Sequence, residues 1–225
     1  MIIDFHAHIQ PGADHGCENL DMSHKQLLLA SQAGVEVVVS VSHFYPYKED
    51  LESYLQRQAK SKAELLALCE SNPELPRVKI GTEVTLCSGL DRMDGLEKLC
   101  IEGTDCILIE MPFTKWDNKL IETLDSIKYG LDLNPILAHV DRYDPKEIEK
   151  LFALDIPGQV NFYSLLPFFG RNKLLSWMKS GHISAIGSDI HNLEPGYKGF
   201  DKALKIIGKE NVSAIMEKSC RLLNL

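Results

Sequence analysis

The 225-residue sequence lacks the features that mark several large classes of protein. Its six cysteines are scattered and form no Cys-x-x-Cys pair, so we interpret them as reduced thiols that fill core or surface positions. No apolar stretch is long enough for a membrane span, and the first residues have no basic region followed by an apolar leader. We therefore expect a cytoplasmic protein that does not insert directly into a membrane.

Positive charge is also scarce. The chain has 24 Lys and Arg against 32 Asp and Glu, a formal net charge of −8, whereas proteins that bind nucleic acid usually carry a basic stripe. A nucleic-acid partner is therefore disfavoured. A small anionic substrate remains possible, because bound cations can reverse the local field. No Gly-x-Gly-x-x-Gly or Gly-x-x-x-x-Gly-Lys loop follows an expected strand, which disfavours nucleotide-binding versions of an open α/β sheet.

Short β-branched runs alternate with longer helical stretches along the whole chain. No repeat or low-complexity linker interrupts the pattern, so we expect one α/β domain over residues 1–225. The expected strands are Ile2–His6, Val35–Ser42, Val78–Val84, Cys106–Met111, Pro135–His139, Gln159–Phe162 and His182–Ile186. The expected helices are Leu20–Ala33, Lys48–Ser71, a short one near Leu96, Lys119–Leu131, Pro145–Leu154, Leu166–Lys179 and two after Gly199.

The placement of unusual polar residues favours a barrel over a doubly wound sheet. These residues fall at the carboxyl ends of the expected strands, which is where (β/α) barrels place their active sites. The first strand ends at His6, followed by Ala7 and His8. Side chains at positions i and i+2 of a strand share a face, so His6 and His8 can point together into the mouth of a barrel. Taken alone, they could equally be two structural or surface histidines.

The other strand ends strengthen the interpretation of a metal site. Buried carboxylates and histidines without partners are costly, and shared metal ions relieve that cost. Imidazole and carboxylate ligands without thiolate suit Mn or Fe, or a catalytic Zn. The further candidate ligands at strand ends are His43, Glu83, Glu110, His139, Asp189 and His191.

A turn-rich loop after His8 adds one more candidate ligand. It contains Asp14 and His15, and either could return over the mouth of the barrel. An Asp in such a loop often only shapes the turn. We favour His15 over Asp14 as the ligand.

Five motifs together resemble the PHP (polymerase and histidinol phosphatase) family. Their order and spacing are most similar to its branch of bacterial protein tyrosine phosphatases that control capsule and exopolysaccharide synthesis. The resemblance extends from Ile2 to about Asn192. The motifs are Asp4-Phe5-His6-Ala7-His8, Pro11-Gly12-Ala13-Asp14-His15-Gly16, Gly81-Thr82-Glu83, Ala138-His139-Val140-Asp141-Arg142-Tyr143 and Ser188-Asp189-Ile190-His191-Asn192.

The resemblance implies a distorted seven-stranded (β/α) TIM-like barrel that holds three divalent ions, often manganese. By motif, His6, His8, Glu83 and Asp189 would bind the first ion. Glu83 would bridge to a second ion, which Glu110 and His139 would also hold. His15, His43 and His191 would bind the third. The implied reaction is metal-assisted hydrolysis of a phosphate ester.

The resemblance further implies a catalytic role for Arg142, which matches the phosphate-binding arginine of the family. A guanidinium can hold a phosphate through two parallel hydrogen bonds. The sequence departs from the branch at two places. His15 stands where a second acidic residue is usual, and no arginine follows the last motif, where Lys198 could replace it.

Several functions are compatible with these residues. The leading hypothesis is a phosphatase acting on phosphotyrosine, such as the tail of a tyrosine kinase of polysaccharide export. A phosphoesterase for a small metabolite resembling histidinol phosphate is the second. An amidohydrolase would share the His-x-His pair, but it typically needs a bridging lysine that no strand end supplies. A non-enzymatic metal-binding module is disfavoured, because no expected ligand is missing.

Overall fold

The computed structural model describes residues 1–225 and contains only parallel strand pairs. The strands form two sheets, in the orders β1-β2-β4 and β3-β5-β6-β7-β8-β9. They are β1 (Ile3–Ala7), β2 (Val37–Ser40), β3 (His43–Phe44), β4 (Arg77–Ile80), β5 (Glu83–Thr85), β6 (Cys106–Glu110), β7 (Asn134–Leu137), β8 (Gly158–Asn161) and β9 (Ile183–Gly187).

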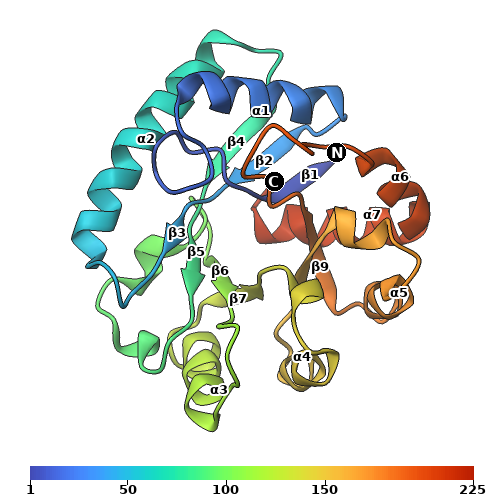
Figure 1. Ribbon diagram of the computed structural model, residues 1–225. Coiled ribbons are helices and arrows are strands. Elements are labelled where there is room, and N and C mark those ends of the chain that lie inside the picture. Colours follow the sequence, from blue (N-terminus) through green and yellow to red (C-terminus); the bar gives the residue numbers. More distant parts are fainter.

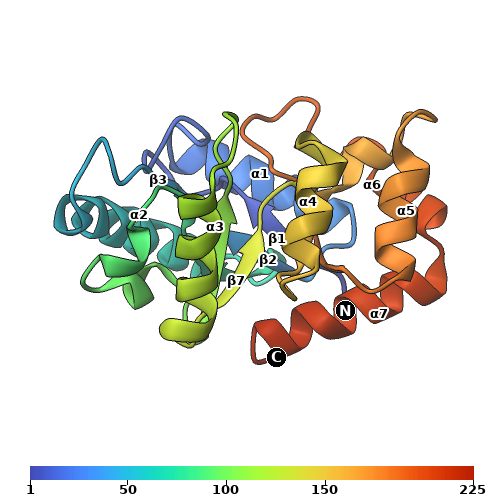
Figure 2. The same cartoon turned by 90° about the horizontal axis from the view of Figure 1, so that it is seen from below.

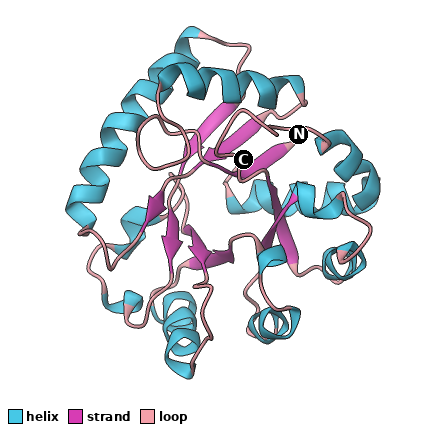
Figure 3. Cartoon of the chain, in the orientation of Figure 1, coloured by secondary structure: helices cyan, strands magenta, loops and turns pink.

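The nine strands occupy seven positions around a barrel. β3 continues β2 after two residues, and β5 continues β4 in the same way. β9 closes the ring onto β1: the amide of Asp189 donates to the His6 carbonyl at 2.6 Å, and the amide of His8 donates to the Ile190 carbonyl at 2.9 Å. Viewed down its axis, the barrel is ringed by helices (Figures 1 and 3). The expected seven-stranded (β/α) barrel is therefore confirmed.

Seven α-helices follow the strands and cover the outside of the barrel. The side chains of Asn19, Asp50, Asp117 and Asp144 cap the amino ends of the first four by accepting hydrogen bonds from backbone amides. No helix has the length and apolar character needed to cross a bilayer. The helices are α1 (Leu20–Gln32), α2 (Leu51–Ser71), α3 (Asn118–Asp125), α4 (Pro145–Phe152), α5 (Arg171–Lys179), α6 (Phe200–Ile207) and α7 (Lys209–Leu222).

The last helix blocks one end of the barrel. Figure 2 shows α7 crossing one end, with the long loops that follow the strands at the other. Met216 of α7 accepts a hydrogen bond through its sulfur from the amide of Ile3, and the Ser219 hydroxyl donates to the Ser184 carbonyl. The carboxyl ends of the strands are thus left as the open mouth.

Two expectations about individual elements were wrong. The helix expected from Leu166 begins only at Arg171, because Pro167 is disfavoured inside a helix and Gly170, with a φ of +83°, turns the chain just before it. The expected strands Val35–Ser42 and Val78–Val84 are each interrupted near their carboxyl ends.

The two interruptions lie side by side, and the Tyr54 hydroxyl of α2 joins them. This fully buried hydroxyl is 2.9 Å from the Ser42 hydroxyl in the first gap and donates to the Thr82 hydroxyl in the second, at 3.0 Å. Gln10 and Gln58 donate to the backbone carbonyls that the gaps expose, including that of Gly81. These contacts therefore satisfy several of the polar groups that the gaps leave outside the regular strand pairing.

Replacing Tyr54 by Phe removes the hydroxyl that joins the two gaps. We expect the free energy of unfolding to fall by about 1–3 kcal/mol, the cost of leaving buried partners unsatisfied. Tyr129→Phe is the matched control, because Tyr129 is 61% exposed and its hydroxyl makes one surface hydrogen bond. Urea unfolding of both variants measures the difference. Equal stability of the two variants would contradict the bridging role.

Candidate metal centre

Four ligand atoms converge at the mouth of the barrel from three parts of its wall. The Nε2 atoms of His6 and His8 lie 3.1 Å apart, and both face Glu83 Oε2, at 3.3 and 3.2 Å. Asp189 Oδ1 lies 3.4 Å from each of the two nitrogens. All four side chains are buried. A tetrahedron with metal–ligand distances of about 2.0–2.1 Å has edges of about 3.3–3.4 Å, so the spacing fits one divalent ion.

Hydrogen bonds on the far side of each imidazole determine which nitrogen faces the cluster. Gln159 Oε1 accepts from the backbone amide of His139 at 2.7 Å, so the 3.1 Å contact with His6 Nδ1 requires that this nitrogen carry the proton. Asp14 Oδ2 likewise accepts from His8 Nδ1 at 2.7 Å. Both Nε2 atoms then present lone pairs. The cluster therefore consists of acceptors with no protein donor among them, which is the arrangement that a cation satisfies.

Two glycines permit this close approach. A Cβ atom on Gly187 would lie 2.7 Å from the Cβ of His6 and 2.7 Å from Gln159 Nε2. A Cβ atom on Gly16 would lie 2.4 Å from the Cβ of His8. Neither position has room for a side chain, so both histidines are packed against bare backbone.

A second group of candidate ligands shares Glu83 with the first. His139 Nε2 lies 2.8 Å from Glu83 Oε1 and 3.7 Å from Glu110 Oε1. The Thr85 hydroxyl donates to the other oxygen of Glu110 at 2.8 Å and so orients its carboxylate. Glu83 Oε1 thus faces His139, whereas Glu83 Oε2 faces His6 and His8 and also lies 3.1 Å from His43 Nδ1. His43, Glu83 and Glu110 together offer ligand atoms within 4.8 Å of one another.

The third group is looser and more exposed. His8, His43 and His191 offer ligand atoms that all lie within 4.8 Å of one another. The ring of His15, which is exposed, stacks on His43 with centroids 4.8 Å apart and lies 4.9 Å from that of His191. Asp14 instead accepts hydrogen bonds from His8, from the amide of His43 and from the amide of Gly16. Asp14 is thus occupied by three hydrogen bonds, whereas the ring of His15 lies beside those of His43 and His191.

The electrostatics of the first group show a need for positive charge. Burial alone would lower the pKa of His8, but Asp14, Asp189 and Glu83 outweigh it and raise that pKa well above its usual value. Burial would raise the pKa of Glu83, but the charge of His6 and the hydrogen bond from His139 hold it well below its ordinary value. Without an ion, the cluster therefore favours the protonated form of its imidazoles and the deprotonated form of its carboxylates.

The looser group behaves differently. Burial, together with the charge of His8, lowers the pKa of His43 to about 3 and that of His191 to about 4. Both imidazoles are therefore neutral near pH 7, the form that binds a metal ion. Burial and the nearby charge of Glu83 raise the pKa of Glu110.

Arg142 lies next to the first group. Its Nη2 donates to Asp189 Oδ2 and, at 2.8 Å, to the Tyr163 hydroxyl. The Arg142 side chain is still 36% exposed, and it lines a pocket together with Phe113 and Tyr143. The side chain of Lys198 is 79% exposed, and its ion-pair partner is Glu194, at 3.9 Å.

Sequence reasoning missed the residues that support the ligands. Gln159 and Asn161 lie two residues apart on β8. Gln159 Nε2 donates to Asn161 Oδ1, and Asn161 Nδ2 in turn donates to Asp189 Oδ2 at 3.3 Å. Asp4 accepts from the Tyr197 hydroxyl and the Ser188 amide beneath the cluster. The signal available was two polar residues at positions i and i+2 of a strand that is otherwise buried.

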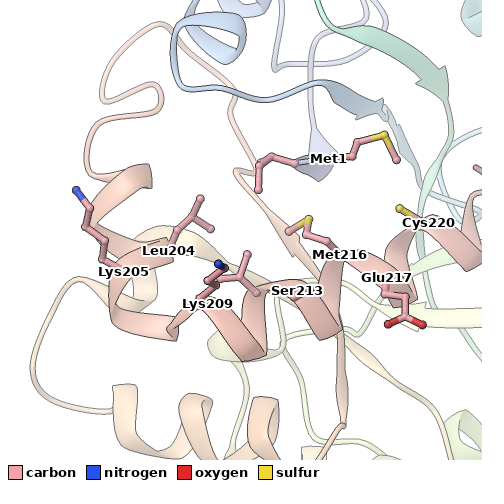
Figure 4. A pocket seen from close by; sticks show the side chains of 10 residues that line it. Met1, Leu204, Lys205, Lys209, Ser213, Met216, Glu217 and Cys220 are labelled. Carbon is pink, nitrogen blue, oxygen red and sulfur yellow. The ribbon is translucent and has the colours of Figure 1, made fainter.

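A groove lies at a different place on the molecule. It has a volume of about 560 Å³ and is formed by the amino terminus with α6 and α7 (Figure 4). Met1, Leu204 and Met216 are among its lining residues, and none of the candidate ligands is. The ligand cluster, rather than this groove, is therefore the candidate active site.

Comparison with known proteins identifies a family and several relatives. The family described as "Capsular polysaccharide synthesis, CpsB/CapC" matches residues 2–221. The tyrosine-protein phosphatase CpsB of Streptococcus pneumoniae is 24% identical over 225 residues, covering 93% of this chain and 90% of the relative. That of Streptococcus agalactiae is 26% identical over 246 residues, covering 95% and 94%.

A solved structure has the same fold. It comes from work on YwqE of Bacillus subtilis and CpsB of Streptococcus pneumoniae, which are described as unique metal-dependent tyrosine phosphatases. The TM-score is 0.84 at 20% identity, and the match covers 99% of this chain and 94% of the other.

Glu83→Gln should reduce bound metal more than any other single change among the candidate ligands, because this carboxylate faces two ligand groups. We expect the purified wild-type protein to hold two or three transition-metal ions per chain after incubation with manganese and gel filtration, and the variant to hold at least one fewer. Glu97→Gln, on an exposed side chain of a short 3₁₀-helix, is the matched control. Elemental analysis of the wild type and both variants measures the number of metal ions per chain. A wild-type protein with no stoichiometric metal would overturn the assignment.

Proposed function

The chain belongs to the CpsB/CapC family of capsular polysaccharide synthesis, and from this membership we propose that it is a metal-dependent phosphatase acting on phosphotyrosine. The observation that carries the proposal is the buried cluster of acceptor atoms with Arg142 beside it. The streptococcal relatives are tyrosine-protein phosphatases, which supports the substrate class.

We propose three divalent ions per chain, with manganese as the leading candidate and iron or zinc as alternatives. Oxygen and imidazole ligands suit these metals. When bound, such ions lower the pKa of coordinated water and polarise the oxygens of a phosphoryl group. The residues that would hold them are His6, His8, Glu83 and Asp189 for the first, Glu83, Glu110 and His139 for the second, and His15, His43 and His191 for the third.

The protein's own groups orient the substrate. Arg142 is anchored through Nη2, and its remaining N–H groups are free to hold a phosphoryl group at the mouth. Gln159 and Asp14 keep the lone pairs of His6 and His8 directed inward, so the ligands need no rearrangement during a turnover.

We further propose that the whole chain acts as one domain in the cytoplasm. Its partner would be a phosphotyrosine-bearing protein of capsule or exopolysaccharide assembly, such as the tail of a tyrosine kinase. The family description, which refers to capsular polysaccharide synthesis, supports this choice.

A substrate panel tests the proposed function. Phosphotyrosine peptides should be hydrolysed with a higher kcat/KM than phosphoserine peptides, sugar phosphates, nucleotides or histidinol phosphate. Activity should disappear with EDTA, return with manganese and survive iodoacetamide. Burial raises the pKa of Cys17, Cys100 and Cys106, so these thiols are poor nucleophiles. A preference for a small phosphate ester would favour a metabolite phosphatase, and loss of activity on alkylation of one cysteine would argue for a thiol mechanism.

Arg142→Ala should lower turnover of phosphate esters by roughly 10²–10³ at saturating metal, the scale of removing one donor that stabilises a transition state. Arg142→Lys should recover only part of this loss, since an ammonium cannot make two parallel hydrogen bonds. Arg92→Ala, on a side chain that is 78% exposed, is the matched control. Full activity of Arg142→Ala with metals bound would exclude the role in phosphate binding.

A further inference from the structure

A pocket of about 330 Å³ opens next to the metal centre, beside the segment that follows β6. Three aromatic residues, Phe113, Trp116 and Tyr143, line it, and Arg142 forms part of the same wall. Its volume lies at the lower end of the range for small-molecule sites, roughly 300–1,000 Å³.

The aromatic rings are arranged around the candidate ligand His139. The ring of Phe113 lies nearly parallel to that of His139, with centroids 6.3 Å apart and an angle of 13°. Tyr143 lies 5.4 Å from Phe113 and 5.7 Å from His139, and Trp116 meets the edge of Tyr143 at 5.5 Å. These three residues, Phe113, Trp116 and Tyr143, form what we call the aromatic shelf.

The shelf is held in place by its own polar atoms. The Tyr143 hydroxyl donates to the Met111 carbonyl at 2.9 Å, and Trp116 Nε1 donates to the Pro112 carbonyl at 2.8 Å. Both donors are therefore used within the protein. What remains for a ligand is apolar ring surface, and Phe113, which is 67% exposed, is the most exposed of the three side chains.

Of the charged residues around the pocket, the cationic side chains of Lys115 and Arg142 are available to contact an anionic ligand. Lys150 is paired with Glu147, and Asp144 caps the start of α4. Lys115 has no acidic partner within 4.0 Å, and Arg142 connects the pocket to Asp189 of the metal centre. An occupant with an aromatic ring and an attached anionic group matches this combination of rings and cations.

We propose that the aromatic shelf binds the ring of an aryl phosphate whose phosphoryl group lies at Arg142 and the metal centre. The inference rests on the proposed function and deepens it, because it names the part of the protein that distinguishes phosphotyrosine from alkyl phosphates. Phe113 is then a specificity residue that contacts the substrate, while Tyr143 and Trp116 position it.

The test uses the metal-loaded protein and its Phe113→Ala and Phe113→Tyr variants. Phenylphosphonate and methylphosphonate, which cannot be hydrolysed, serve as competitive inhibitors and differ only in the ring. Free phosphotyrosine, a phosphotyrosine peptide and glycerol phosphate serve as substrates. Phe168→Ala is the matched control, because Phe168 is 68% exposed and lies against Arg171 instead of the cluster.

We expect Phe113→Ala to weaken phenylphosphonate inhibition roughly three- to tenfold, the scale of one lost aromatic pair, with methylphosphonate inhibition unchanged. The KM for free phosphotyrosine should rise by a similar factor, while glycerol phosphate kinetics and metal content stay constant. Phe113→Tyr should restore the preference for the ring. Because each variant is compared with the wild type on the same substrate, the differences in leaving group between substrates do not affect the comparison.

Two results would contradict the proposal that the aromatic shelf binds the ring of the substrate. Equal losses for both phosphonates would mean that Phe113 supports the metal centre only. A loss confined to the peptide would mean that the pocket holds a neighbouring residue instead of the ring. Failure of the proposed function is distinct, since the wild-type protein itself would then hydrolyse no phosphotyrosine substrate.

Discussion

The constraint on which the rest of the structure depends is the convergence of four acceptor atoms in a buried space. The two imidazole nitrogens lie 3.1 Å apart, and each lies 3.2–3.4 Å from one oxygen of Glu83 and one oxygen of Asp189. Such an arrangement would be strongly unfavourable without a cation or protons. The surrounding contacts enforce it: Gln159 and Asp14 hold the two imidazoles from behind, and Gly187 and Gly16 let the backbone approach them closely.

The barrel holds the ligands in place through its regular strand pairing and also through the interruptions in its strands. β9 closes onto β1 at the level of the ligands, so His6 and Asp189 are joined by a backbone hydrogen bond as well as by their side chains. The breaks before β3 and β5 place His43 and Glu83 at the mouth, and Tyr54 satisfies the hydroxyl groups exposed there. Because α7 covers one end of the barrel, the carboxyl ends of the strands form its open end (Figure 2).

Much of this could be predicted because the signals are local. Runs such as Ile107-Leu108-Ile109 indicate strands that are covered on both faces, and a polar residue such as Glu110 at the end of a run indicates the mouth. The i, i+2 spacing of His6 and His8 puts both side chains on one face. The helix beginning at Arg171 was placed too early, because the apolar residues Leu166 and Phe169 continue its pattern across Pro167, and Phe169 proves to be 90% exposed.

The residue types at the strand ends can be read directly from the amino-acid sequence, and they indicate the kind of barrel and a cluster of potential metal ligands. How those residues contact one another is visible only in the folded chain. Gln159 accepts a hydrogen bond from His6, which lies 153 positions away, and Asp14 accepts one from His8. Phe113 lines the same pocket as Arg142, although the two residues belong to different loops. The physical reason is that periodicity specifies the face on which a side chain lies, whereas tautomers, shared carboxylates and pocket walls depend on distances between strands that are remote in the chain.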